Sequence, residues 1–296
     1  MKKTILTLSI LAAISLSGYA QSMPSLFIPS DPVAAGLALS TLARDATAYA
    51  AADNASAMAF SETRFKGGLS YGMWQPSVAD SKTVNAGTFL KMNDRISVGF
   101  AASYILDKET SITNFNGAVT GTFTPKDIVA RVGASYLIND NLSVGVTAKM
   151  LHSSISPELS GSAFGGDISA MYKKESWSAS AALCNLGTAI TYSESYSMPM
   201  CFKAGASVSF WNFIVSAEAD YLFDGAFSAA AGAEYDVSDI FFTRIGYHYG
   251  SSDKGLPSFA SIGCGVKLWG IDLNLGCMTL SDTLGETAYF GLAYSF

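Results

Sequence analysis

The chain is poor in charged residues and has no long apolar run beyond its first twenty positions. Only 14% of its 296 residues are charged, whereas 49% are hydrophobic, and soluble domains usually carry roughly 25% charged residues. After residue 20, no apolar run reaches the length of about 18 residues that a membrane-spanning helix needs. A closed β-barrel is therefore the membrane form that remains, and one large soluble β domain is the alternative.

Residues that bind metals, phosphates or nucleic acids are also scarce. The two histidines, His152 and His248, are expected on separate strands and lack the spacing of metal ligands. The glycines, including Gly165-Gly166, form neither a phosphate-binding loop nor a dinucleotide fingerprint. The formal net charge of −6 argues against a nucleic-acid partner. We therefore expect no cofactor, no metal and no nucleic acid.

The first twenty residues predict a secretory signal peptide. Lys2 and Lys3 precede an apolar run from Ile5 to Leu16, and small residues occupy both cleavage positions in Gly18-Tyr19-Ala20. We expect cleavage near Ala20, which leaves 16 basic and 24 acidic residues and a net charge of −8. The prediction is an exported protein of the Gram-negative cell envelope.

From Phe65 onward, the chain divides into fourteen segments in which apolar residues alternate with small or polar ones, the period of a β-strand. The segments begin near Phe65, Ser81, Arg95, Pro125, Asn141, Ala163, Ser176, Met200, Phe213, Phe227, Ile240, Ser258, Ile271 and Glu286. The last segment, Glu286 to Phe296, ends on an aromatic residue, which favours the closing strand of an outer-membrane barrel.

The connections between these segments alternate in length. Tight turns are expected at Asn93-Asp94, Asn139-Asp140, Lys174-Glu175, Trp211-Asn212, Asp236 to Asp239 and Trp269-Gly270. Longer loops are expected at Lys108 to Thr124, Ser153 to Ser162, Thr188 to Pro199 and Gly250 to Pro257. Short turns at one end and long loops at the other are typical of outer-membrane barrels, whose chain ends lie in the periplasm. The prediction is an all-β protein, with a 14-stranded antiparallel transmembrane β-barrel over residues 63–296.

The two faces of the predicted strands differ in polarity. One register is apolar, as in Ile96, Val98 and Phe100, and we expect it to face outer-membrane lipid. The other register carries small residues and charges, because a charge facing lipid near the midplane costs about 2 to 4 kcal/mol. The charged or ionisable residues expected to form ion pairs in the lumen are Arg131, Lys149, Asp167, Glu218, Asp220, Glu234, Arg244, His248, Lys267 and Asp272. All four tryptophans, Trp74, Trp177, Trp211 and Trp269, are expected at the membrane interfaces.

Residues 21–62 differ from the rest and predict a plug. Asp31 followed by Pro32 is typical of a helix N-cap and first helical position, and the Ala-rich stretch that follows predicts one or two short helices. A fourteen-stranded barrel leaves a lumen that needs partial filling. We expect this segment, with Asp31, Pro32, Gly36, Asp45 and Asn54, to fold into the barrel mouth as a plug or hatch; a periplasmic tail is the alternative.

A pair of carboxylates is the best candidate for catalysis. Glu218 and Asp220 lie two apart on one strand face, about 7 Å between Cα atoms, a spacing that an acid/base pair can use. Basic residues occupy the same register, which favours structural ion pairs instead. We therefore expect a non-enzymatic protein.

The four cysteines fall into two pairs. Pairing the twelfth and thirteenth strands across Trp269-Gly270 puts Cys264 opposite Leu275 and Cys277 opposite Ile262. The two cysteines are then diagonal neighbours, and their separation of about 7 to 8 Å exceeds disulfide geometry. We expect these two to be free, lipid-facing thiols. Cys184 and Cys201 flank the loop from Thr188 to Pro199, and the sequence leaves open whether they meet.

Several stretches in order resemble the PorV/PorQ family of outer-membrane proteins, and their order is closer to PorV. They are Ser30 to Gly36 (SDPVAAG), Asp45 to Ala48 (DATA), Ile112 to Gly117 (ITNFNG), Gly121 to Asp127 (GTFTPKD) and Asn185 to Gly187 (NLG). The chain departs from the family near Asn54-Ala55-Ser56, where the family's Pro is missing, and in its shorter loops.

The resemblance implies a FadL-like fourteen-stranded barrel that serves type IX protein secretion by binding the C-terminal signal domains of exported cargo and other secretion components. On this interpretation, cargo docks on the loops at 108–124 and 188–199. Two alternatives stay open. One is a FadL-like passive transporter of a small hydrophobic ligand, and the other is a structural outer-membrane scaffold.

Overall fold

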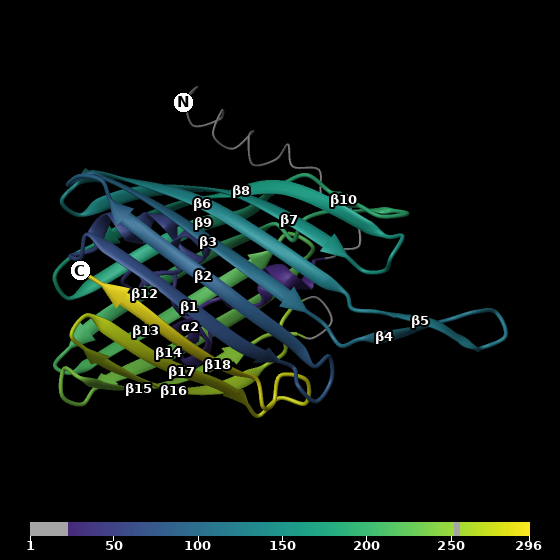
Figure 1. Cartoon of the computed structure of the whole chain (residues 1–296). Coiled ribbons are helices and arrows are strands. Elements are labelled where there is room, and N and C mark those ends of the chain that lie inside the picture. Colours follow the sequence, from purple (N-terminus) through teal and green to yellow (C-terminus); the bar gives the residue numbers. More distant parts are fainter. Residues whose placement is uncertain (1–22, 252–254) are drawn as a thin grey trace, which may run out of the picture.

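The protein is described by a computed structural model that covers residues 23–251 and 255–296. The predicted signal peptide and its cleavage position lie outside these residues. Fourteen antiparallel strands close into a barrel (Figure 1). The barrel strands are β1 (Phe65–Trp74), β2 (Ser81–Lys91), β3 (Ile96–Leu106), β6 (Lys126–Asn139), β7 (Leu142–Ser154), β8 (Ser160–Lys173), β9 (Trp177–Gly187), β12 (Cys201–Phe210), β13 (Phe213–Leu222), β14 (Ala226–Asp236), β15 (Phe241–Tyr249), β16 (Phe259–Leu268), β17 (Ile271–Thr279) and β18 (Ala288–Ser295).

The predicted fold is confirmed. Each of the fourteen predicted segments coincides with a barrel strand, and every predicted start lies within three residues of the observed one. The barrel closes between β1 and β18, where Lys66 pairs with Ser295 and Leu69 with Leu292. The alternating pattern succeeds as a predictor because each strand places one face outside and one inside the barrel.

The two ends of the barrel differ. At one end, which we call the turn end, tight turns join the strands and the backbone of Phe65 bonds with that of Phe296. At the other, the loop end, two connections form small hairpins: β4 (Thr110–Thr113) with β5 (Val119–Phe123), and β10 (Ile190–Thr191) with β11 (Ser195–Tyr196). The β4–β5 hairpin, here called the outer hairpin, projects away from the barrel (Figure 1). The loop predicted from Ser153 to Ser162 is shorter, because β7 and β8 extend into it.

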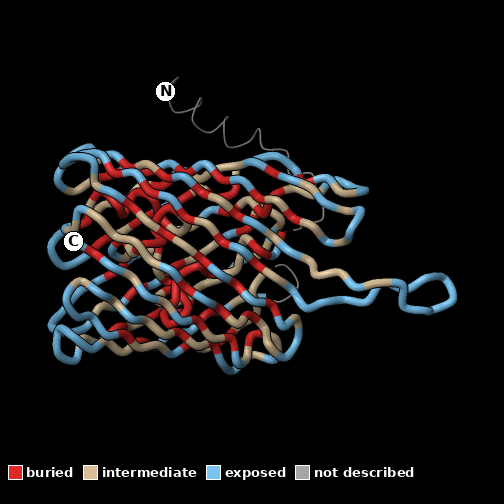
Figure 2. Tube along the Cα trace, in the orientation of Figure 1, coloured by how far each residue is buried: buried red, intermediate tan, exposed pale blue. Residues whose placement is uncertain are grey.

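Buried and exposed residues alternate along many of the strands (Figure 2), and many of the exposed ones are large apolar residues. Along β3, Val98 and Phe100 are 39% and 42% exposed, whereas the alternate residue Ala101 is 1% exposed. The expectation for Trp74 is wrong, since this side chain is only 5% exposed and packs inside near Tyr289. The reason is its register, because Trp74 falls on the inward face of β1.

Residues 23–61, here called the plug segment, lie inside the barrel. They form η1 (Pro24–Phe27), α2 (Pro32–Gly36), α3 (Ala50–Asp53) and η2 (Ala55–Phe60). The first helix, α2, packs on β15 to β18, whereas α3 and η2 pack on β2, β3 and their neighbours β6 to β8. Among the described residues, no helix is both long enough and apolar enough to cross a membrane.

Glycines in the wall allow the plug segment to approach closely. A Cβ atom at Gly276 of β17 would lie 2.3 Å from the carbonyl oxygen of Pro32. On the far side of the lumen, a Cβ atom at Gly145 of β7 would lie 2.3 Å from the backbone nitrogen of Ser56. Both distances are far below van der Waals contact, so these glycines place the plug backbone directly against the wall.

Candidate functional site

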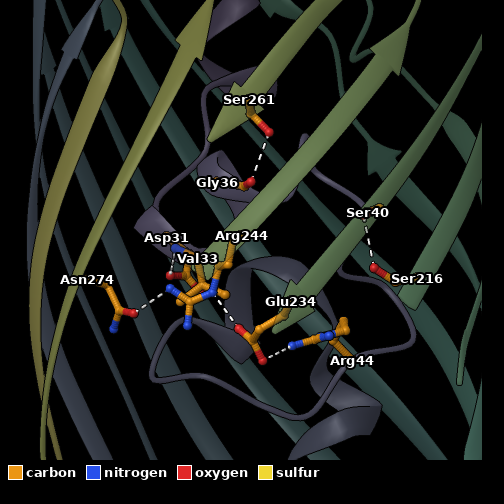
Figure 3. A network of polar contacts seen from close by, with 10 residues as sticks. All are labelled: Asp31, Val33, Gly36, Ser40, Arg44, Ser216, Glu234, Arg244, Ser261 and Asn274. Carbon is orange, nitrogen blue, oxygen red and sulfur yellow. Dashed lines mark hydrogen bonds and ion pairs between the residues drawn. The ribbon is translucent and has the colours of Figure 1, made fainter. Parts of the chain in front are cut away.

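A buried group of charges around Glu234 joins the plug segment to the wall (Figure 3). Arg44 of the plug segment donates to Glu234 Oε1 at 2.6 Å, and Arg244, which lies opposite on β15, donates to Glu234 Oε2. Arg244 also donates to Asn274 at 2.8 Å. The three charged side chains are 7% to 11% exposed. Since a buried charge needs a partner, this group fixes the plug segment to β14 and β15.

A second group of charges surrounds Lys203. Its ammonium group lies 3.0 Å from Glu218 Oε1 and 3.0 Å from Asp220 Oδ2. The other oxygen of Glu218 accepts a hydrogen bond from the backbone nitrogen of Leu42 at 2.9 Å. The two carboxylates therefore share one lysine and Glu218 also holds the plug segment, which is the geometry of a structural ion pair.

A third group lies at a β-bulge between β8 and β9. Lys149 pairs with Asp167 at 2.8 Å and donates to Asn185 Oδ1 at 2.7 Å. Asn185 adopts a left-handed conformation with φ of 61° and donates from its side chain to the carbonyl oxygen of Pro199. The sequence analysis named Lys149 and Asp167 as ion-pair residues and Asn185 only as part of a family-like stretch, although Asn is a residue that tolerates this conformation.

Four predicted lumen residues make no ion pair with the described residues: Arg131, His248, Lys267 and Asp272. Arg131 is 5% exposed and makes one long hydrogen bond, to Ser103 at 3.4 Å, while its Nε has no partner. His248 stacks on Phe259 with ring centroids 4.9 Å apart. Lys267 lies opposite Asp272 across β16 and β17, but it is exposed at the turn end.

Asp31, Pro32 and Gly36 lie at α2. The side chain of Asp31 caps this helix by accepting from the backbone nitrogen of Val33 at 2.8 Å. Burial raises the pKa of Asp31, although hydrogen bonds and the charge of Arg244 oppose this change. The carbonyl oxygen of Gly36 accepts from Ser261 of β16 at 2.9 Å (Figure 3).

The other two predicted plug residues occupy different environments. Asn54 is buried and donates to the carbonyl oxygen of Leu42 at 2.6 Å and to Ser180 Oγ of β9 at 2.9 Å. Asp45 is mostly exposed and pairs with Lys173 at the turn end. Asn54 therefore orders the plug segment internally, whereas Asp45 contacts the rim of the barrel.

Two of the cavities bordered by the described residues lie in the lumen, one towards each end of the barrel. The larger, of about 790 Å³, opens among turn-end residues such as Asp140 and Glu175 and has a charged lining. The smaller, of about 150 Å³, lies towards the loop end. Thr41 and Asp53 line both cavities. Thr41 and Asp53 therefore lie between the two spaces.

The smaller cavity has an apolar and a charged side. Its apolar lining includes Phe27, Ile28, Leu42, Leu222 and Leu256. Its charged lining includes Arg131, Lys149, Lys203, Glu218 and Asp220. The cavity therefore combines aliphatic and aromatic surface with fixed charges, most of which are already paired.

Asp53, which the sequence analysis did not single out, is an unusual member of the lining. No hydrogen bond from the described residues reaches its carboxylate. Burial raises the pKa of Asp53 to about 7, and the charge of Asp31 adds to this effect, while Arg131 and Lys203 oppose it. One signal in the sequence could have pointed to Asp53, because the plug segment has few charged residues. Between residues 23 and 60 they are Asp31, Arg44, Asp45 and Asp53.

An apolar cluster covers the loop end of the lumen. Residues 188–199, here called the lid, contribute Ile190 and Met198, which are 0% and 3% exposed. They pack against Met23 of the plug segment and against Val129 and Leu151 of the wall. The lid is thus folded into the mouth and is not a free external loop.

The cysteine pairs occupy the predicted strands. The register confirms that Cys264 lies opposite Leu275 and that Cys277 lies opposite Ile262, so the two are diagonal neighbours. Cys184 and Cys201 lie directly opposite each other on β9 and β12. Within residues 23–251 and 255–296, no three His, Cys, Asp or Glu side chains gather as a metal site.

Comparison with known proteins gives structural likeness alone. No model of a known protein family matches the chain, and no curated protein matches its sequence. The toluene transporter TbuX of Ralstonia pickettii aligns with a TM-score of 0.60 at 14% identity, over 89% of this chain and 96% of that one. The Pseudomonas putida toluene transporter TodX aligns with a TM-score of 0.61 at 14% identity, over 88% of this chain and 98% of that one. A Pseudomonas aeruginosa FadL homologue aligns with a TM-score of 0.59 at 15% identity, over 91% of this chain and 96% of that one. The fold is therefore that of a FadL-like outer-membrane barrel.

Proposed function

We propose that the protein is a passive outer-membrane transporter of small hydrophobic solutes that carry a polar group. The turn end then faces the periplasm and the loop end faces the outside. The observation that carries the proposal is a pair of cavities inside a closed barrel that are separated by Thr41 and Asp53. Structures of toluene transporters with the same fold add support.

The smaller cavity indicates the class of solute. One wall offers apolar side chains such as Leu222 and Leu256, which favour a hydrocarbon surface. The other wall offers Arg131, a cation with no ion-pair partner among the described residues, which favours a polar group on the solute. At about 150 Å³ the cavity is below the roughly 300 to 1,000 Å³ of usual ligand pockets, so the solute is small.

Passage requires two local movements and no rearrangement of the barrel. The lid has to release Ile190 and Met198 at the loop end. The plug segment has to separate Thr41 and Asp53 from the facing side chains. The groups of charges around Glu234 and Lys203 hold the rest of the plug segment in place.

Uptake by whole cells tests this function. Hydrophobic solutes cross pure phospholipid bilayers unaided, so the assay needs cells with an intact lipopolysaccharide leaflet. Cells that carry the protein are expected to take up a labelled small aromatic alcohol faster than cells without it, while uptake of a hydrophilic sugar stays unchanged. Equal uptake of the aromatic alcohol by both cells would contradict the proposal.

A second candidate is the cargo-binding role that the PorV resemblance implies. The outer hairpin supports it, since Phe115 is fully exposed and Ile112 and Val119 are 37% and 64% exposed outside the barrel. Ile112 and Phe115 belong to a stretch that resembles the family. On this proposal, deletion of residues 110–123 abolishes co-purification of proteins that share a C-terminal signal domain, while deletion of the exposed connection 75–80 does not. Recovery of the same proteins without the outer hairpin would exclude it as the docking site.

A further inference from the structure

Cys184 and Cys201 are two thiols brought face to face by the barrel. They form the last pair in the β9–β12 ladder towards the loop end. The two residues are 7% and 3% exposed, and their thiols are free in the structure and lie within hydrogen-bonding reach of each other. Opposite residues of antiparallel strands have Cα atoms about 4.5 to 5.5 Å apart, within the range that disulfides use.

We propose that Cys184 and Cys201 form a disulfide in the exported protein and that this bond fastens the root of the lid. The ladder between β9 and β12 ends at this pair, β9 continues to Gly187 beside β8, and residues 188–199 then form the lid. A hydrogen bond from Asn185 to the carbonyl oxygen of Pro199, at 2.8 Å, crosses the same fork. The bond would add a covalent link where the ladder ends.

The wall near Cys184 needs such a link because its other neighbour is irregular. The register of β8 against β9 shifts at Asp167, so the two strands are not regularly paired at Cys184. Lys149 and Asn185 bind Asp167 there and stabilise the bulge with polar contacts. A disulfide to β12 therefore secures the least regular part of the wall.

The reaction is a dithiol–disulfide exchange. Both S–H bonds break, one Sγ–Sγ bond forms, and two electrons and two protons pass to a disulfide-bearing oxidant, which becomes two thiols. In the folded protein, Leu42 and Leu222 pack on the pair, and the adjoining cavity holds only about 150 Å³. The exchange therefore takes place during folding, before the plug segment is seated. Afterwards the bond is shielded from reductants.

The second pair of cysteines provides an internal control. Cys264 and Cys277 are diagonal neighbours on β16 and β17 and lie outside the distance range of a disulfide. They should remain thiols under the same conditions. Their thiols can be counted in the same sample.

The test is a thiol count on protein purified from outer membranes, quenched with an alkylating reagent and denatured without reductant. The expected result is two alkylated thiols, at Cys264 and Cys277, and a peptide that links Cys184 to Cys201. In Cys184→Ser, the count should rise to three, because Cys201 loses its partner. Four thiols in the wild type, or a link between Cys264 and Cys277, would overturn the proposal.

A second measurement tests the fastening role. The temperature at which the barrel loses its folded mobility in gel electrophoresis should fall by about 5 °C or more in the Cys184→Ser, Cys201→Ser double variant, since a loop of this length gains substantially from closure. A Cys264→Ser, Cys277→Ser double variant is the matched control and should melt as the wild type does. Equal melting of the two double variants would contradict a role at the lid.

Discussion

The two ends of the lumen are built differently. At the turn end, a wide cavity of about 790 Å³ has a charged lining that includes Lys66, Asp140 and Lys174. At the loop end, the lid and η1 bury an apolar cluster over a cavity of about 150 Å³. The turn end is therefore wide and lined by charges, whereas the loop end is narrow and combines an apolar cover with a partly charged cavity. On the proposed function, both the barrier and the selection of solute lie at the loop end.

The plug segment maintains this difference because it touches both ends. Its first residues, from Met23, pack under the lid, and its charged residues Arg44 and Asp45 bind partners nearer the turn end. The apolar end is fixed by close packing, and the charged end by ion pairs. Changes at the two ends should consequently have different effects on passage.

Removal of the plug segment should have the largest effect. Deletion of residues 24–61 empties the lumen of a fourteen-stranded barrel, which is wider than its wall side chains can fill. Permeability to hydrophilic sugars should rise by orders of magnitude and the difference between the two ends should vanish. The measurement is osmotic swelling of proteoliposomes. A shift in gel mobility on heating shows that the barrel of the variant is folded. Swelling no faster than that of the intact protein would show that something else closes the lumen.

Removal of the lid should have the next largest effect. Deletion of residues 189–197 takes away Ile190 and exposes Met23, Val129 and Leu151. Uptake of a small hydrophobic solute should rise several-fold, because the apolar cover of the smaller cavity is gone. Deletion of the outer hairpin, residues 111–122, is the matched control and should leave uptake unchanged. If both deletions gave the same uptake, the lid would not be the barrier.

Loss of the carboxylate at Glu234 should weaken the turn-end attachment. Glu234→Gln leaves Arg44 and Arg244 facing each other without their shared anion. Breaking a buried pair on one side costs about 3 to 5 kcal/mol. Limited proteolysis should then cut the plug segment faster than in the wild type. Glu175, an exposed turn residue, provides the control, because Glu175→Gln should leave the rate of cleavage unchanged. Equal cleavage of the two variants would refute a structural role of Glu234.

The smallest expected effect is a pH dependence that originates in Asp53. Its pKa is raised from 3.8 to about 7 in the folded protein, so the seated plug segment binds a proton that a water-exposed Asp53 releases. The free energy that holds the plug segment in the barrel should therefore be most favourable at acid pH. It should become less favourable as the pH rises from about 4 to about 7 and stay constant above that. Protease cleavage of the plug segment should therefore be faster at pH 7.5 than at pH 5.

Two substitutions identify the origin of this pH dependence. Asp53→Asn removes the titrating group and should make cleavage of the plug segment much less sensitive to pH. The control is Asp45→Asn, at an exposed position, which should retain the dependence of the wild type. A pH profile that survives Asp53→Asn would assign the effect to another group.

The wall could be predicted from the sequence almost completely. Alternation fixes the face of each residue, so Phe100 and Ala101 fall on opposite sides without any knowledge of their neighbours. Turn signals such as Trp269-Gly270 fix the register, and the opposition of Cys264 and Leu275 follows from it. The prediction for Trp74 was wrong because a position at the end of a strand does not determine whether the ring faces the lipid or the lumen.

The interior was harder to predict, because its contacts join residues far apart in the chain. The contact of Arg44 with Glu234 depends on how the plug segment turns inside the barrel, and no local pattern determines this path. The same holds for Asp53, whose place between two cavities depends on α3 as a whole. The lid was predicted as an external loop. The length of residues 188–199 indicates a long connection between two strands, but it does not indicate whether that connection folds outward or into the barrel mouth.

The central claim is that the loop-end cavity selects and passes the solute, and one uptake assay tests it most directly. Ala226→Phe places a ring in the smaller cavity, whereas Ala231→Phe adds the same ring to an exposed position of the same strand, β14. In cells with an intact lipopolysaccharide leaflet, the account predicts that uptake of a small aromatic alcohol falls to the level of cells without the protein for Ala226→Phe and stays unchanged for Ala231→Phe. Undiminished uptake in a folded Ala226→Phe barrel would contradict it.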